Sequence, residues 1–309
     1  MLQQYIDSVL RQHGVPSAQL LGEGVEALVY ELDADRVIRF YKQRTDALYQ
    51  QLLQLRDFYD ALDADAAGLR VPKVLEVYDE GDYIFTIDQR LPDKQLGRVL
   101  AALPESQAWQ LLEDYLFTAS RVSKLHRPFS YYGEVLGINP VRTDTWPTFI
   151  SQKVASAYAL AQSQFDQAVG DMASILTFIE KEVQSVAAGI RPLLVHGDFN
   201  AMNTLLDGRQ RIFAVADFGS LTLAGDPRMD LACGIFGFMN AEDGMLPEHG
   251  RFLLDKMRHQ HGEDIIRAVH VYRLYYAIVF ASTCKESDPR TYKWSMGSLR
   301  SHLSGQWDY

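Results

Sequence analysis

An aspartate, an asparagine and a second aspartate follow one another at short intervals in the second half of this 309-residue chain. Asp198 comes after an apolar run, Asn203 stands five residues later, and Asp217 follows a predicted β-hairpin with its turn at Asp207-Gly208. A carboxylate can accept the proton of an attacking hydroxyl, while an amide oxygen and a second carboxylate can hold Mg²⁺ on nucleotide phosphates. The spacing therefore predicts a phosphoryl-transfer site, with Asp198 as catalytic base and Asn203 and Asp217 as metal ligands.

The segment around these residues resembles the aminoglycoside phosphotransferase family of the protein-kinase-like superfamily. The family pattern is H-x-D-x-x-x-x-N, then an apolar strand ending in Asp, then G-D-P-x-x-D-L-A. It corresponds here to residues 196–203, to the strand before Asp217 and to residues 225–232. Within this pattern we expect His196 to brace the catalytic loop and Asp230 to be a buried acceptor for N–H groups of that loop.

The resemblance implies an α+β, protein-kinase-like fold with two lobes. A small antiparallel β-sheet lobe that binds the nucleotide would span residues 1–91, and a larger, mainly α-helical lobe with the catalytic and acceptor sites would span residues 92–309. The length of the chain agrees with two units, since a domain averages ~150 residues.

Two glycines near the N-terminus, Gly22 and Gly24, stand between apolar runs where a turn could close over phosphates. A complete G-x-G-x-x-G pattern would need a third glycine at Ala27. On the next predicted strand, Arg39 occupies the position at which kinases carry the phosphate-contacting lysine. Lys42 is the alternative, but it points to the other face of the strand. We expect Gly22, Gly24 and Arg39 to contact the nucleotide.

A helix predicted over residues 45–62 follows, with apolar residues recurring every three or four positions. Kinases place a glutamate on this helix to pair with the strand cation. This sequence offers glutamines instead, at Gln50, Gln51 and Gln54, with Asp57 one turn later. A glutamine can orient a guanidinium by hydrogen bonding but adds no charge, so the partner of Arg39 stays open.

The end of a second predicted hairpin, residues 87–92, is interpreted as the hinge between the lobes. In this interpretation Asp88, Gln89 and Arg90 lie against the nucleotide, and backbone groups of the hinge bind the adenine edge. The helices predicted for the second lobe span residues 104–126, 149–169, 171–188, 247–260 and 263–284.

The acceptor is expected to be a small molecule. A protein kinase needs a long activation segment and an A-P-E motif after D-F-G, but Gly225-Asp226-Pro227 follows Asp217 almost at once. The resemblance implies transfer to a hydroxyl of an aminoglycoside or related aminocyclitol. Choline, homoserine and fructosamine kinases are alternatives, as is a nucleotide-binding pseudokinase. Residues 242–290 contain eight acids and seven Lys or Arg, which gives no clear acidic pocket for a polycation.

Composition narrows the choice of partners. The net charge of -10 argues against nucleic acid, whose phosphates require a basic surface. We expect ATP, or alternatively GTP, with Mg²⁺ as cofactor. The first helix lacks the apolar core of a signal peptide, and residues 271–282 are too short to cross a bilayer. A cytoplasmic protein without a membrane partner is predicted, and the oligomeric state is left open.

Overall fold

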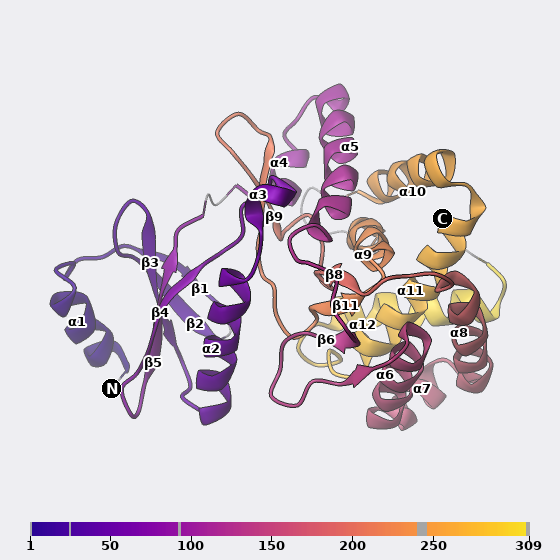
Figure 1. The fold of residues 1–309 in the computed structure, drawn as a ribbon, viewed down its shortest axis with the longest axis horizontal. Helices are drawn as coiled ribbons and strands as arrows, with labels where there is room; N and C mark the ends of the chain where they lie inside the picture. Colours follow the sequence, from indigo (N-terminus) through magenta and orange to yellow (C-terminus); the bar gives the residue numbers. More distant parts are fainter. Residues whose placement is uncertain (1, 25, 92–93, 240–245, 307–309) are drawn as a thin grey trace.

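The computed structural model describes residues 2–24, 26–91, 94–239 and 246–306. In the N-terminal lobe, strands rich in β-branched and aromatic residues form one antiparallel sheet (Figure 1). Its strands, in the spatial order β1-β2-β3-β5-β4, are β1 (Leu20–Glu23), β2 (Ala27–Glu31), β3 (Arg36–Tyr41), β4 (Val74–Asp79) and β5 (Ile84–Gln89).

Each face of this sheet is covered by one helix. Because side chains alternate along a strand, Ile38 and Phe40 of β3 pack with α1 (Leu2–Gln12), whereas Tyr41 packs with α2 (Asp46–Asp60). The Thr45 hydroxyl caps α2 by accepting a hydrogen bond from the Leu48 N–H. Helix α2 lies on the face turned toward the C-terminal lobe (Figure 1). Arg39 shares that face with Tyr41. The short α3 (Ala64–Ala67) follows.

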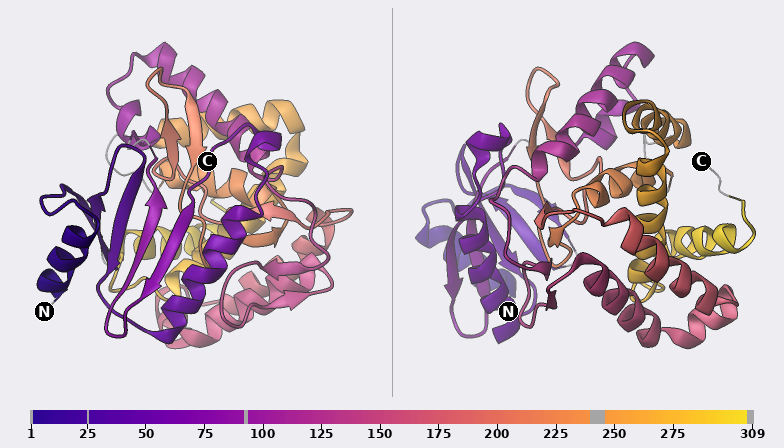
Figure 2. Two further views of the ribbon diagram at one scale, coloured as in Figure 1. Left: turned by 60° about the vertical axis from the view of Figure 1, so that its left-hand side comes forward. Right: turned by 45° about the vertical axis from the view of Figure 1, so that its right-hand side comes forward.

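The C-terminal lobe is built around one buried helix, α11, in which 14 of the 19 residues are buried. It packs against α6, α8, α9, α10 and α12, and Figure 2 shows these helices gathered on the side away from the N-terminal sheet. The helices are α4 (Leu96–Leu100), α5 (Glu105–Val122), α6 (Trp146–Leu160), α7 (Gln162–Ala168), α8 (Met172–Val186), α9 (Arg228–Met239), α10 (Pro247–His261), α11 (Glu263–Ala281) and α12 (Pro289–Leu303).

One helix prediction needs correction. A single helix was expected over residues 149–169, but the structure has two, α6 and α7, which meet at Ala161. The backbone of Ala161 leaves the helical region there, with φ of −131° and ψ of 31°. Helix α6 also begins earlier than expected, because the Thr145 hydroxyl caps it and Pro147 fits its first turn.

Short strands carry the predicted catalytic residues between the two lobes. A four-stranded sheet has the order β7-β6-β11-β8, and β9 and β10 form a separate hairpin. These strands are β6 (Tyr132–Glu134), β7 (Arg142–Thr143), β8 (Leu193–Val195), β9 (Thr204–Leu206), β10 (Ile212–Val215) and β11 (Leu223–Gly225). The loop 196–203 connects β8 to β9, and Asp217 follows β10, so the hairpin returns the chain to the loop.

The architecture confirms the predicted α+β fold, with an antiparallel sheet in the first lobe and a helical second lobe. The boundary placed at residue 91 stays a prediction, since residues 92–93 lie outside the described part. Among the described residues, no helix combines the length and apolarity needed to cross a membrane.

Candidate active site

The carboxylate of Asp198 is held by two asparagine side chains of its own loop. The Asn200 amide donates to Asp198 Oδ1 at 3.1 Å, and the Asn203 amide donates to Oδ2 at 3.1 Å. The Asn200 side-chain oxygen in turn accepts from the Asn203 N–H at 3.0 Å. Asn200 is therefore part of the loop's framework, a role that its position two residues after Asp198 does not reveal in the sequence.

His196 connects the catalytic loop to the chain before Asp217. Its Nε2 lies 2.8 Å from the Ala216 carbonyl oxygen, and its Nδ1 lies 3.2 Å from the Asp198 N–H nitrogen. One neutral tautomer satisfies both contacts, with Nε2–H donating and Nδ1 accepting. Burial lowers the pKa of His196 to about 4, which keeps the ring neutral. This geometry suits the bracing role expected from the sequence.

Asp230 at the start of α9 is fully buried and accepts hydrogen bonds from two backbone groups of the loop. The His196 N–H donates to Oδ2 and the Gly197 N–H to Oδ1, both at 2.9 Å. These are the contacts that its expected role requires. Burial raises the pKa of Asp230 to about 7, against the opposing effect of these two hydrogen bonds.

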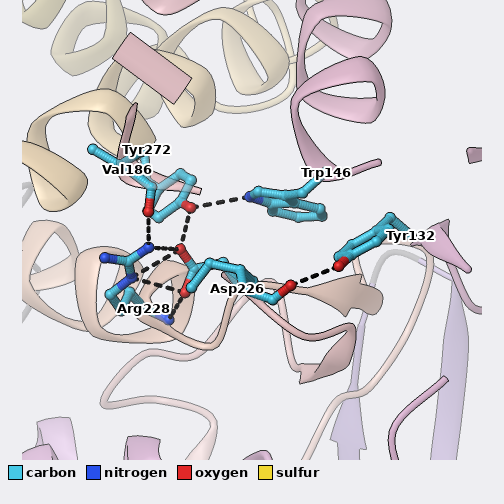
Figure 3. Close-up of polar contacts among 7 residues, drawn as sticks. Tyr132, Trp146, Val186, Asp226, Arg228 and Tyr272 are labelled. Atoms are coloured by element: carbon cyan, nitrogen blue, oxygen red, sulfur yellow. Dashed lines mark hydrogen bonds and ion pairs between the residues drawn. The ribbon is translucent and has the colours of Figure 1, made fainter. Parts of the chain in front are cut away.

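A buried polar cluster fixes the helix that carries Asp230 (Figure 3). Asp226, with no solvent exposure, forms an ion pair with Arg228 at 2.6 Å and accepts a hydrogen bond from the Tyr272 hydroxyl. The Tyr272 oxygen also accepts from Trp146 Nε1 at 3.0 Å. Because these residues come from the start of α9, from α11 and from α6, the cluster joins the catalytic loop's support to the C-terminal core.

Asp217 stands opposite the catalytic loop and is exposed. Its backbone is left-handed, with φ of 70°, a conformation that non-glycine residues adopt rarely and that is typical of functional sites. Burial, aided by the charge of Asp217, raises the pKa of Asp198 to about 6. The two carboxylates are therefore close enough to repel each other.

The donor set at this point fits Mg²⁺. The Asp217 carboxylate and the Asn203 side-chain oxygen are hard oxygen donors, and Mg²⁺ commonly takes one or two carboxylates and completes its shell with phosphates and water. The Asn203 oxygen has no hydrogen-bond donor among the described residues, which leaves it available to a cation. A cation here would also relieve the repulsion between Asp198 and Asp217. The described residues contain no group of three or more His, Cys, Asp or Glu side chains of the kind that holds a metal ion without a nucleotide.

A cavity of about 890 Å³ opens between the lobes beside Asp217. Its walls combine the turn after β1, strand β3, helix α2 and the loop after β10. Three residues predicted to contact the nucleotide, Gly22, Gly24 and Arg39, line it. Lys42, the alternative to Arg39, instead pairs with Glu23 at 2.7 Å. The structure thus brings the glycine turn, Arg39 and Asp217 together around one space.

The partner of Arg39 comes from the sheet and not from helix α2. Arg39 Nε donates to Asp88 Oδ2 at 3.1 Å, and Asp88 is 8% exposed. Gln51 and Gln54 of α2 line the same cavity, but the Gln54 oxygen accepts from the Gly137 N–H at 3.3 Å. The sequence left this partner open because β3 and β5 are far apart along the chain.

The placement of Asp88 corrects the interpretation of the hinge. Asp88 is inside β5 and its side chain faces Arg39, so it does not lie at the connection between the lobes. The N–H groups of Gln89 and Arg90 donate to the carbonyl oxygens of Lys73 and Asp35, both at 2.8 Å. The Arg90 guanidinium pairs with Glu31 at 2.5 Å. These N–H groups and this side chain are engaged within the lobe itself.

A second cavity, of about 260 Å³, has Asp198 in its wall. Its walls come from α9, α11, α12 and the catalytic loop. Four of the lining side chains are aromatic: Phe236, Tyr276, Phe280 and Trp294. Asp198 and Asp288 are the lining carboxylates among the described residues. No local spacing links these residues, because they meet only when the C-terminal helices pack.

Comparison with protein families agrees with this geometry. A model of the phosphotransferase enzyme family (APH) matches residues 17–266, which is most of the chain and includes Arg39, Asp88, the loop 196–203, Asp217 and Asp230. The chain belongs to this phosphotransferase family. A comparison with curated proteins finds no match.

Solved structures of aminoglycoside phosphotransferases share the fold of this family member. The GDP complex of wild-type aminoglycoside 2'-phosphotransferase-IIIa aligns with a TM-score of 0.64 and 16% sequence identity over 99% of both chains. The streptomycin–ATP–APH(2")-IIa ternary complex aligns with a TM-score of 0.60 and 17% identity, over 96% of this chain and 95% of the other. The structure of the GDP and kanamycin complex of another APH(2") enzyme gives 0.59 and 16%, over 98% and 99%. At such identities the likeness establishes the protein-kinase-like fold alone.

Proposed function

We propose that this chain transfers the γ-phosphate of ATP or GTP to a hydroxyl of a small molecule. The observation that carries the proposal is that Asp198 lines one cavity, while Asp217, whose charge acts on Asp198, lines another. One cavity has the glycine turn, Arg39 and Asp217 in its walls, and the other has an aromatic lining. A carboxylate placed between a phosphate site and an acceptor site is the arrangement that phosphoryl transfer needs.

In this proposal each residue acts mainly by position and charge. Asp198 is fixed by Asn200 and Asn203 and accepts a hydrogen bond from the acceptor hydroxyl. This contact aims the hydroxyl oxygen at the γ-phosphorus. Its pKa of about 6 leaves it ionised at neutral pH and able to take the proton as the new P–O bond forms and the bond to the leaving diphosphate breaks. Asn203 and Asp217 would hold Mg²⁺, which would neutralise charge on the phosphate oxygens. Arg39 would contact the phosphates from β3.

The nature of the acceptor follows from the second cavity. The neighbouring structures contain streptomycin and kanamycin, and aminoglycosides or aminocyclitols are the first acceptors to test. The cavity of about 260 Å³ is below the usual range of ~300–1,000 Å³ for ligand pockets. Its aromatic walls suit stacking or cation–π contact more than the pairing of many ammonium groups. These features favour a compact amino alcohol such as choline or homoserine as the second candidate.

The deciding assay measures nucleoside diphosphate release from Mg·ATP and Mg·GTP with single acceptors. The set would contain kanamycin, streptomycin, a hygromycin-type aminocyclitol, choline, homoserine and a fructosamine. Asp198→Asn should abolish acceptor-dependent release. Asp255→Asn, which changes an exposed carboxylate of α10 outside the walls of both cavities, should leave the release unchanged.

Two other results of that assay would argue against phosphoryl transfer by this chain. Binding of Mg·nucleotide without turnover on any acceptor would support a nucleotide-binding pseudokinase. An absence of nucleotide binding would refute the proposed function, because the cavity beside Asp217 would then serve another purpose.

A further inference from the structure

The ion pair between Arg39 and Asp88 has a directional geometry. Asp88 Oδ2 contacts Arg39 at Nε, on one edge of the guanidinium. A guanidinium has five N–H donors in a rigid, planar fork, so this contact leaves the two terminal nitrogens to other ligands. The Arg39 side chain is 43% exposed and lines the cavity beside Asp217, whereas that of Asp88 is 12% exposed. The buried carboxylate thus holds the inner edge of a cation whose outer end faces the cavity.

Asp88 has one evident counter-charge for its buried carboxylate. Its second oxygen, Oδ1, has no hydrogen-bond partner among the described residues. Burial raises the pKa of Asp88, and the adjacent Arg39 charge is the main opposing effect. A buried carboxylate with so little solvation is stable only while its cation stays nearby. The Asp88 carboxylate therefore holds Arg39 in place.

Helix α2 does not supply an alternative carboxylate. Its residues in the cavity wall are Leu48, Gln51, Leu52, Gln54 and Leu55, none of which is charged. Asp57 of the same helix is exposed and pairs with the neighbouring Arg56. In protein kinases the strand cation pairs with a helix glutamate, so a shift of the helix can break the pair. In this chain both partners lie on adjacent strands, with Arg39 opposite Thr86 and Val37 opposite Asp88.

We propose that Asp88 is the positioning residue that orients the Arg39 guanidinium toward the nucleotide phosphates. This inference rests on the proposed function. Its specific content is that the phosphate contact is built into the β3–β5 pairing and does not depend on a carboxylate of α2. Asp88 touches neither substrate and acts through Arg39.

The test is Asp88→Asn, which keeps the size of the side chain and removes its charge. Losing one charge-assisted hydrogen bond should weaken Mg·nucleotide binding and raise its KM roughly tenfold or more. The KM of the acceptor should stay within about twofold, since neither Arg39 nor Asp88 lines the cavity proposed for the acceptor. The matched control is Asp79→Asn. It removes another aspartate–arginine pair, from Asp79 at the end of β4 to Arg44 at 2.8 Å, whose residues do not line the cavity, and nucleotide binding should not change.

A double-mutant cycle separates positioning from a general structural effect. In an Arg39→Gln background, Asp88→Asn should cause no further loss of nucleotide affinity, because the residue that it orients is already gone. An equal loss with and without Arg39, or an unchanged KM in Asp88→Asn, would overturn the inference. If Asp88→Asn does not fold, Asp88→Glu keeps the charge but displaces the carboxylate by one methylene, and the same split between the two KM values is expected.

Direct binding of Mg·nucleotide to the unaltered protein keeps this inference distinct from the proposed function. If the unaltered protein binds no nucleotide, the proposed function itself fails. If it binds nucleotide and Asp88→Asn binds equally well, only the role of Asp88 fails.

Discussion

Replacing Gly197 by alanine should disrupt the active site, because the added Cβ would collide with the backbone of Leu221. Gly197 directly precedes Asp198 and has φ of 83°. An added Cβ would lie 1.8 Å from the Leu221 carbonyl oxygen and 2.6 Å from the Leu221 carbonyl carbon. Both contacts are to backbone atoms, so no side-chain rotation can relieve them. The catalytic loop and the segment after Asp217 would have to move apart by about an ångström.

Two costs add up in this variant. A non-glycine residue in a left-handed conformation costs about 1–2 kcal/mol, and overpacking a dense interior costs about 1–3 kcal/mol. The free energy of unfolding should therefore fall by roughly 2–5 kcal/mol. The displacement would also separate Asp198 from Asp217, and a misplacement of about 1 Å can reduce turnover by about a hundredfold.

Urea unfolding followed by tryptophan fluorescence measures the first effect, and kcat with the best acceptor measures the second. The matched control is Gly208→Ala in the β9–β10 turn, where an added Cβ meets nothing within 4 Å. It should be within about 1 kcal/mol of the unaltered protein. An alanine at position 197 with unchanged stability and unchanged kcat would show that the two segments are not packed as described.

Two other side chains give predictions of the same kind. Asp230→Asn keeps one acceptor oxygen but turns an amide donor toward the N–H of His196 or Gly197. The free energy of unfolding should therefore fall by about 1.5–3 kcal/mol, and kcat should fall as well. Urea unfolding and turnover that both match the unaltered protein would contradict this. Burial, and to a smaller extent the charge of the nearby His302, lower the pKa of His270 from 6.5 to about 3. Because the unfolded chain then binds more protons, stability should fall as the pH drops from about 6.5 to about 3, by about 2 kcal/mol at pH 5. In His270→Gln the difference in unfolding free energy between pH 7 and pH 5 should shrink accordingly, and an unchanged difference would refute the assignment.

The proximity of the residues proposed for catalysis was predictable because they are local in sequence. Asp198 and Asn203 belong to one loop, and the β9–β10 hairpin returns the chain to that loop at Asp217. Hydrogen bonds within a few residues determine this geometry, so spacing alone identifies it. Asp230 is more distant, but it follows the loop in the same motif.

The partner of Arg39 was not predictable because it depends on strand register. Arg39 and Asp88 are 49 residues apart and meet only through the β3–β5 pairing. Sequence spacing placed residues 87–92 near the hinge but did not show which face of β5 each side chain takes. A shift of one residue in register would have moved Asp88 to the α1 side of the sheet.

The cavity proposed for the acceptor illustrates a different limit. Counting acids over residues 242–290 mixes side chains on opposite faces of α10, α11 and the chain between α11 and α12. Most of the described acids in that range are exposed, and two of them, Asp255 and Glu263, pair with Arg258. Asp288 alone among the described ones lines the cavity. Composition over a long window therefore could not report the chemistry of a cavity that four separate segments build.

Different elements build the two halves of the site, so one half can change while the other is retained. The contacts proposed for the phosphates come from the N-terminal sheet and from the loop after β10, whereas the acceptor cavity is lined mainly by α9, α11 and α12. Asp198 lines the second cavity, and the backbone of its loop is held by Asp230, whose helix is fixed by the Asp226 cluster. Substitutions at Phe280 or Trp294 would alter which hydroxyl compound fits without touching any of these supports. Acceptor preference can therefore diverge within this fold while the arrangement around Asp198 is retained, which is why the family match alone does not determine the acceptor.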